Sequence, residues 1–237
     1  MASKNATFDL EASEALLLPF RRMILAFLIL CGFMIFAWLV GWLYVFKLYP
    51  EDGIPRLEQT LIREMARVND IHSNYLPVRS ISVNTANVVY SAVYGSSGIT
   101  EMGDRFQRGE YLSESDVRAG RLYAEYYPWL KASMISSQLL GLRLGMLVCV
   151  LPATLLFYFI AFSDGIVERA IRRDCGGRES ASIYHRAKYL QLTVLCIFTL
   201  LYLAWPTPTI YPGAPIAFSV LIGLLARIQW KYYKKYL

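Results

Sequence analysis

Four uncharged apolar runs dominate the chain, and polar segments of very unequal length separate them. The runs cover residues 23–46, 144–162, 189–205 and 210–226. Each approaches the roughly 20 residues that an α-helix needs to cross a bilayer core of roughly 30 Å. The fourth run holds Pro212 and Pro215, so its uninterrupted apolar part is shorter. We therefore predict four transmembrane helices over these four ranges.

The longest polar segment, residues 47–143, also carries a helical pattern. Apolar residues recur at steps of three and four from Ile54 to Ile71, which predicts an amphipathic helix to about Tyr75, where Pro77 limits it. Residues 83–94 fit a helix or a strand, and we favour a helix because no partner strand is visible. We call residues 47–143 the inter-span domain and expect it to be mostly helical.

Two further helices are expected in the second half of the inter-span domain. Residues 99–107 suit a short helix, and the acids of Ser113–Asp116 suit the first turn of a long one that runs towards the second span. Pro128 interrupts that long pattern beside an aromatic cluster of the kind that settles at a membrane surface. The predicted fold class is thus an all-α membrane protein.

Basic residues next to the spans predict the orientation, because Lys and Arg are retained on the cytoplasmic side. They fall in three places. Arg21 and Arg22 precede the first run, six basic residues lie within residues 163–188, and the last run is followed by Arg227, Lys231, Lys234 and Lys235. The tail 1–22, the loop 163–188 and the tail 227–237 are then cytoplasmic, while 47–143 and the turn 206–209 are extracytoplasmic (periplasmic). We expect a multi-pass protein of a bacterial inner membrane with both termini cytoplasmic.

Composition narrows the function. The chain is 56% hydrophobic and 18% charged, and its net charge of +6 comes mainly from the juxtamembrane clusters. Such clusters attract anionic lipid, so sequence-specific binding of nucleic acid is not expected. The spans carry no Asp, Glu, Lys or Arg between their ends, which argues against an ion or proton carrier.

Catalytic motifs are missing from the sequence. It holds no G-x-x-x-x-G-K-[ST], no G-x-S-x-G and no H-E-x-x-H. Its two histidines, His72 and His185, fall on opposite sides of the membrane in the predicted topology, so they cannot share a metal. We expect no enzyme activity, no metal and no cofactor.

The end of the inter-span domain holds an arginine with two possible roles. At the mouth of the second span, Arg143 can extend its long side chain to the interface, which is the reading we favour, or it can be a buried functional residue. Gly141 and Gly145 flank it and permit close helix contact, which suits packing within one bundle.

The loop 163–188 predicts a helical hairpin. Ser163 or Asp164 can cap the first helix, whose arginines include Arg172 and Arg173, and Gly176 and Gly177 then end that helix in a left-handed cap. The second helix opens at Ser180 or Glu179 and continues through Tyr184 and His185. Arg178 and Glu179 lie at the tip. They either hold the hairpin together by salt bridges or present a docking surface to a cytoplasmic partner.

The same loop carries a resemblance to a known family. The strings at 164–165 (DG), 177–180 (GRES) and 184–188 (YHRAK) are similar to the signature of an inner-membrane protein family of integrative and conjugative elements, whose function is unknown. Its members share the four-span plan and are typically encoded beside a TraD-type coupling ATPase. Where this chain has Arg186, the family often has a second histidine, so a histidine pair has no support here.

The resemblance implies a role in conjugative DNA transfer, and the residues limit that role. Without a nucleotide site the chain cannot be the motor, and without a nuclease constellation it does not suit the relaxase. We expect a non-enzymatic accessory component of the type IV secretion apparatus whose partner is the coupling ATPase or another conjugation membrane protein. It could also form a homo-oligomer. The alternative is an exclusion protein that blocks redundant transfer into recipient cells.

Overall fold

The computed structural model describes residues 21, 24–25, 27–29, 31–71, 77–110, 114–176, 181–208 and 213–233, and in these ranges its regular structure is helical, with no strand. In chain order, the elements after the first helical segment are η1 (Tyr44–Leu48), α2 (Gly53–Asp70), α3 (Val78–Tyr90), η2 (Ser91–Gly95), α4 (Ile99–Gln107), α5 (Glu114–Asp174), α6 (Ala181–Ala204) and α7 (Gly213–Lys231). Two of them, η1 and η2, are single π-helical turns.

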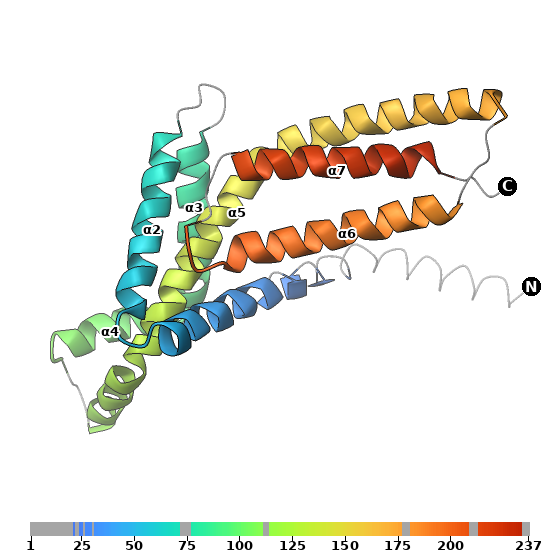
Figure 1. Cartoon of the computed structure of the whole chain (residues 1–237). Coiled ribbons are helices and arrows are strands. Elements are labelled where there is room, and N and C mark those ends of the chain that lie inside the picture. Colours follow the sequence, from blue (N-terminus) through green and yellow to red (C-terminus); the bar gives the residue numbers. More distant parts are fainter. Residues whose placement is uncertain are drawn as a thin grey trace, which may run out of the picture.

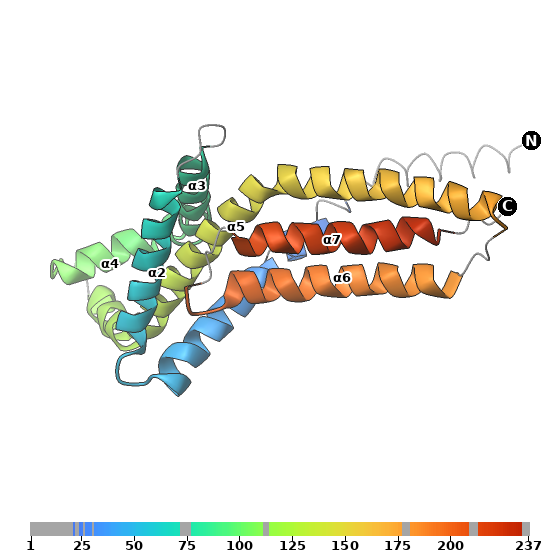
Figure 2. The ribbon, with the colours of Figure 1, turned by 45° about the horizontal axis from the view of Figure 1, so that its top comes forward.

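Four helices are long and apolar enough to cross a membrane, as the sequence predicts. They are Phe27–Leu48, a part of α5, Ser182–Ala204 and Ala214–Lys231. We call Phe27–Leu48 the first span. The second half of α5 lies side by side with α6 and α7 in both Figure 1 and Figure 2. The prediction of an all-α chain with four membrane-length apolar helices is therefore confirmed.

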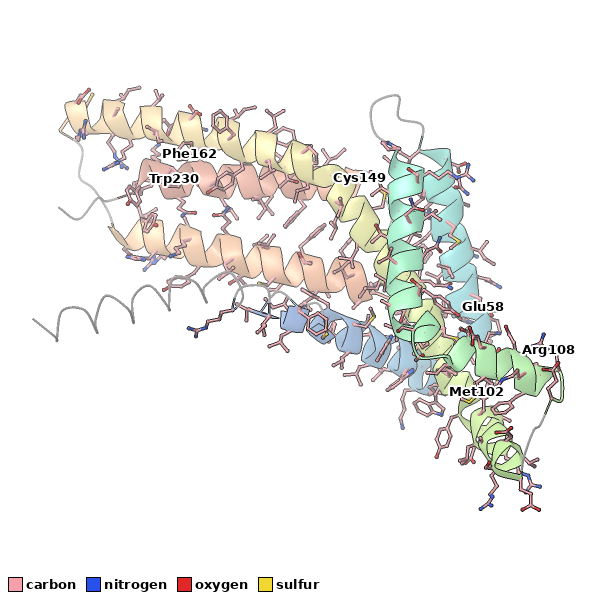
Figure 3. All side chains as sticks on the ribbon, turned by 180° about the vertical axis from the view of Figure 1, so that it is seen from behind. Glu58, Met102, Arg108, Cys149, Phe162 and Trp230 are labelled. Atoms are coloured by element: carbon pink, nitrogen blue, oxygen red, sulfur yellow. The ribbon has the colours of Figure 1, made fainter. Side chains whose placement is uncertain are left out.

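The most unusual element is α5, a single helix of 61 residues. At about 1.5 Å per residue it measures about 90 Å along its path, far more than a membrane requires. The helix continues through Pro128 and Pro152, and it bends near Cys149, close to the second proline (Figure 1, Figure 3). A proline in a helix interior removes one backbone hydrogen bond and favours such a bend. The predicted boundaries at 143/144 and 162/163 both fall inside this one helix, and Pro128 does not interrupt it.

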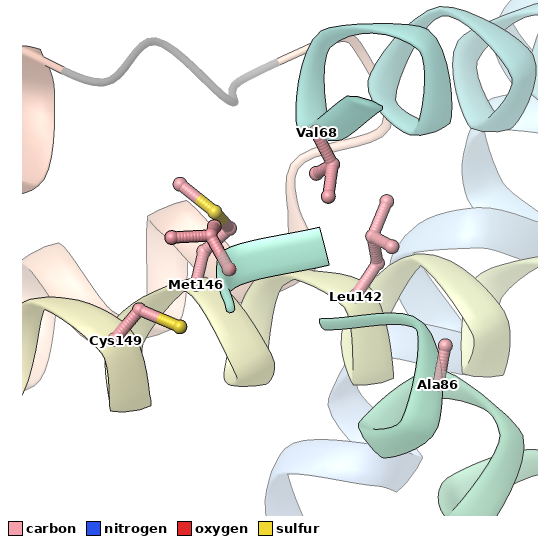
Figure 4. Close-up of a cluster of buried hydrophobic side chains, with 6 residues drawn as sticks. Val68, Ala86, Leu142, Met146 and Cys149 are labelled. Atoms are coloured by element: carbon pink, nitrogen blue, oxygen red, sulfur yellow. The ribbon is translucent and has the colours of Figure 1, made fainter. Parts of the chain in front are cut away.

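Helices α2 and α3 lie side by side and steeply inclined to α6 and α7 (Figure 1). Their apolar faces meet α5 in a small core that Figure 4 shows. Its buried members are Val68, Val78, Ala86, Leu142, Met146 and Cys149. The apolar face of α2 is thus buried against α5, which joins the inter-span domain to the membrane-length apolar helices.

The first span contacts α5 through aromatic and small residues. The indole nitrogen of Trp38 donates a hydrogen bond to the Ser137 hydroxyl at 2.7 Å. The ring of Phe46 stacks on Trp129 with centroids 3.8 Å apart. Trp129, beside Pro128, therefore packs against the end of the first span.

Residues 83–94 are helical, which decides between the two readings of that segment. The short helix expected at 99–107 is present with the same bounds as α4. The helix that begins near Ile54 ends at Asp70. Ile71, the next residue, has an extended backbone, so the predicted continuation towards Tyr75 was wrong at this position, and residues 72–75 lie outside the described residues.

Candidate functional site

A buried ion pair joins α2 to α5 where the inter-span domain meets the spans. The Arg143 guanidinium faces the Glu64 carboxylate through two of its nitrogens, with Nη2 to Oε1 at 2.7 Å and Nε to Oε2 at 2.9 Å. The side chains are only 1% and 0% exposed. Such a bidentate contact fixes both the distance and the orientation of the two helices.

The remaining donors of Arg143 bind the end of α6. Nη1 donates to the carbonyls of Tyr202 at 3.3 Å, Leu203 at 3.1 Å and Trp205. Nη2 donates to the Thr207 carbonyl at 3.1 Å. All three guanidinium nitrogens thus have acceptors. Arg143 therefore ties three elements together: its own helix α5, α2 and the C-terminal end of α6. We call this arrangement the arginine lock.

The sequence explains why α6 offers free carbonyls at this point. The helix ends at Ala204, and Pro206 and Pro208 follow, which have no backbone N–H and cannot continue it. The last carbonyls of a helix lack partners within the helix and carry the negative end of its dipole. A guanidinium is a suitable cap for them, and the Glu64 carboxylate balances its charge.

The arginine lock leaves no room for a substrate. The cavity beside it, lined in part by Leu57, Ser136 and Leu203, measures about 10 Å³. That volume is at the lower limit for a single water molecule. The pair is therefore suited to holding helices in place, and it offers no site for binding or converting a ligand.

Arg143 is buried, so the favoured reading, in which its side chain extends to the interface, was wrong. The alternative is correct as to burial, whereas a functional role of Arg143 stays a prediction. The physical reason is that Glu64 and the α6 carbonyls satisfy the guanidinium inside the protein. Glu64 was missed by sequence reasoning. It had a signal, because it lies on the apolar face of α2 in line with Leu57 and Val68, where a carboxylate is out of place.

Two glycines let α3 approach α5 beside the arginine lock. A Cβ on Gly145 would lie 2.4 Å from the Cα of Ser82, and a Cβ on Gly141 would lie 2.6 Å from the Cα of Ala86. Both distances are far below van der Waals contact. The glycine pair serves close packing within the chain, as expected, and its partner is the inter-span helix α3.

A second group of charges joins α5 to α7 at the opposite end of the spans. Arg227 forms ion pairs with Asp164 and Glu168, and Lys231 Nζ lies 2.7 Å from Glu168 Oε2. These side chains are between 24% and 48% exposed. We call them the α5–α7 charge cluster. Because water screens exposed pairs, each is worth far less than the buried pair.

Several predicted docking residues gather beside the α5–α7 charge cluster. Arg172 donates to the carbonyl of Lys231, and its guanidinium carbon lies 4.2 Å from the centre of the Tyr232 ring. Tyr184 packs edge-on against Tyr233 at 5.4 Å and against His185 at 5.2 Å. Aromatic packing continues into the spans between Phe162 and Trp230, at 4.6 Å (Figure 3). The structure therefore brings the ends of α5, α6 and α7 into one surface.

The other predicted residues fall as follows. Arg173 and Arg21 are exposed on helices. Asp164 lies inside α5, so it is no helix cap, because the helix does not begin there but runs from Glu114 to Asp174. Gly176 has φ of 71°, in the left-handed region expected for it. Outside the described residues lie Arg22, His72, Gly177, Arg178, Glu179, Ser180, Lys234 and Lys235.

Within the described ranges, no group of three or more His, Cys, Asp or Glu side chains could hold a metal ion. The four cysteines are free thiols, of which Cys149 is buried and Cys175 and Cys196 are exposed.

One comparison with known proteins gives a match. A family model described as IncC plasmid conjugative DNA transfer protein DtrJ-like covers residues 49–234. The matched region includes α2 to α7, and thus both the arginine lock and the α5–α7 charge cluster. Neither the search of curated proteins nor the search of solved structures finds a match.

Proposed function

Because this chain belongs to the DtrJ-like family of conjugative DNA transfer proteins, we propose that it is a non-enzymatic inner-membrane accessory component of a type IV secretion apparatus. In this role it anchors or regulates the coupling ATPase. The match to a conjugation family agrees with the resemblance seen in the loop 163–188. The inner-membrane location and the link to an integrative element remain parts of the proposal.

The observation that carries the proposal is the continuity of α5. One helix reaches from the inter-span domain, through the apolar region, to the basic end at Arg172 and Arg173. The arginine lock holds it near its middle, at Arg143, and the α5–α7 charge cluster holds it near its C-terminal end. Such an element can position a soluble domain at a defined place beneath the membrane.

The chemistry of the basic end suits a protein partner. Arg173 is exposed at the end of α5, where Arg172 packs over Tyr232 and Tyr184 packs against Tyr233. Arginine and tyrosine are the residue types that most often anchor protein interfaces. The loop with Arg178 and Glu179 directly follows this surface in the sequence. We propose that the coupling ATPase docks here, on the cytoplasmic side.

The docking proposal is tested with Arg178→Glu, Glu179→Lys and Arg173→Glu in donor cells. We expect normal membrane insertion, less co-purification with the coupling ATPase and a lower transfer frequency. Arg79→Glu is the control, because Arg79 is exposed on α3 in the inter-span domain. Wild-type co-purification and transfer in all three docking variants would disprove a docking role.

A second experiment separates this role from exclusion of incoming DNA. The gene is deleted in donors only, or expressed in recipients only, and transfer is counted. A fall on deletion in donors, with no effect in recipients, is the result we expect. A large fall on expression in recipients would instead make it an exclusion protein.

A further inference from the structure

Three adjoining grooves follow α6 from the inter-span domain into the membrane-spanning part of the chain. The first, of about 520 Å³, lies between α2 and the loop after α6 and is lined mainly by polar residues, among them Arg56, Arg63 and Thr207. The other two, of about 480 and 450 Å³, lie between α6 and α7. Thr207 and Pro208 line both the first and the second groove, so both grooves border the loop after α6.

The polar groove carries a net positive charge. Arg56 and Arg63 are seven residues apart and thus share one face of α2. Arg56 Nε lies 2.7 Å from the Asp52 carboxylate, and both side chains are about half exposed. Among the described residues, Arg63 forms no ion pair. The positive charge of Arg63 therefore has no carboxylate partner among the described residues, and its side chain is exposed to water.

The two inner grooves are apolar and lie within candidate spans. They share Phe198, Leu201 and Ala214, so they form one continuous channel along α6 and α7. The rings of Phe198 and Phe218 stack in it, with centroids 3.9 Å apart. From Val194 to its end at Ala204, α6 borders the channel over 11 residues, a rise of about 15 Å, which is about half of a bilayer core of about 30 Å.

We propose that this composite groove binds an anionic glycerophospholipid. The lipid phosphate lies at Arg63 and Arg56, and one acyl chain follows the channel between α6 and α7 through the depth of one leaflet. The continuity of a cationic groove with an apolar channel is the form that a phospholipid requires. The site goes beyond the proposed function and does not depend on it.

A lipid fits this groove better than the other occupants do. An extended peptide would bring polar backbone groups for which the apolar channel offers few hydrogen-bond partners. A free phosphate would use the cationic end alone and leave the channel unexplained. An acyl chain carries no polar groups, so the channel can bury it without leaving a hydrogen-bonding group unpaired.

The lipid site adjoins the arginine lock. The Thr207 carbonyl accepts a hydrogen bond from Arg143 Nη2 at 3.1 Å, and Thr207 also lines the polar groove and the channel. A lipid in the groove would therefore contact the same loop that Arg143 holds. Binding of the lipid should stabilise the position of α2 against the end of α6.

Native mass spectrometry of the full chain in detergent tests the proposal, with dioleoyl-phosphatidylglycerol and dioleoyl-phosphatidylcholine as probes. We expect about fivefold tighter binding of the anionic lipid, the effect of about one arginine near a membrane surface. Arg63→Gln should abolish that preference. Ala217→Trp, which fills the channel, should reduce the binding of both lipids. Arg79→Gln, on the exposed side of α3, is the matched control and should change neither.

Four results would overturn the proposal. They are equal affinity for the two lipids, an unchanged preference in Arg63→Gln, unchanged binding in Ala217→Trp, and displacement of the lipid by glycerol 3-phosphate alone. The last result would indicate a site for soluble phosphate. Size-exclusion profiles identical to the wild type show that each variant is folded, so none of these results can be attributed to unfolding.

Discussion

Breaking the arginine lock should destabilise the protein strongly and asymmetrically. Removing one partner of a buried ion pair costs about 3–5 kcal/mol, because the other charge stays buried without compensation. For Glu64→Gln we expect about 3 kcal/mol, since Arg143 keeps its carbonyl acceptors on α6. For Arg143→Gln we expect about 5 kcal/mol or more, because both the Glu64 carboxylate and those carbonyls lose their donor.

The chain contains a matched control for this prediction. Lys131 and Glu58 pair across the same two helices, α5 and α2, at the same distance of 2.7 Å, but their side chains are 35% and 41% exposed. Lys131→Gln should therefore cost no more than about 1 kcal/mol. The two pairs differ in burial and in the further contacts of Arg143, which binds Glu64 through two nitrogens and also the carbonyls at the end of α6.

The free energy of unfolding is measured in mixed micelles, with sodium dodecyl sulfate as the denaturant and near-ultraviolet circular dichroism as the signal. The double variant Arg143→Gln/Glu64→Gln should cost clearly less than the sum of the single variants, with a coupling energy of about 1–3 kcal/mol. The reasoning is refuted if Arg143→Gln costs no more than Lys131→Gln, or if the two single costs simply add.

Three further predictions concern other parts of the molecule. Gly145→Ala places a Cβ 2.4 Å from a backbone carbon of α3 and should destabilise the protein by about 1–3 kcal/mol. The Cβ added by Gly32→Ala meets nothing within 4 Å, so this control variant should be neutral or stabilising. The free energy of unfolding in mixed micelles measures both effects. In a variant whose only thiol is Cys175, a membrane-impermeant maleimide should react only after the cells are permeabilised, because Cys175 is predicted to be cytoplasmic. In a variant whose only thiol comes from Ser97→Cys, the same reagent should react in intact spheroplasts. The reverse labelling pattern would show that the predicted topology is inverted. Arg227→Gln removes ion pairs whose side chains are 24–48% exposed, so the free energy of unfolding should fall by no more than about 1 kcal/mol. A larger fall in the free energy of unfolding would show that the α5–α7 charge cluster is structurally essential.

Local patterns allowed much of the fold to be predicted from the sequence. Apolar run length predicted the four spans, and spacing of three and four residues predicted α2 and α4. Both signals depend on neighbours within a few turns of a helix, so they can be read without knowledge of the tertiary structure. The helical reading of residues 83–94 also proved correct, although β-branched residues there favour strands.

The features that depend on distant contacts were not predicted. Arg143 and Glu64 are 79 residues apart, and the α6 carbonyls are about 60 residues further along the chain. No local pattern records such a meeting. The continuity of α5 was missed for a similar reason, since Pro128 locally disfavours a helix while packing of Trp129 against Phe46 supports it.

The candidate docking surface was predicted only in part. Charge and glycine spacing indicated a basic helix end, and the structure places Arg172, Tyr184 and His185 near the end of α7. The contribution of α7, through Tyr232 and Tyr233, had no signal in the loop itself, because it depends on how the spans pack.

The most direct test of the central claim is photo-crosslinking in cells that are transferring DNA, with a photoreactive residue in place of Arg173. Arg173 is exposed at the end of α5, and Val88, which is exposed on α3, provides the control position in the inter-span domain. We predict that the coupling ATPase is captured from position 173 and not from position 88. Capture of the coupling ATPase from neither position, in cells whose transfer frequency is normal, would contradict the account.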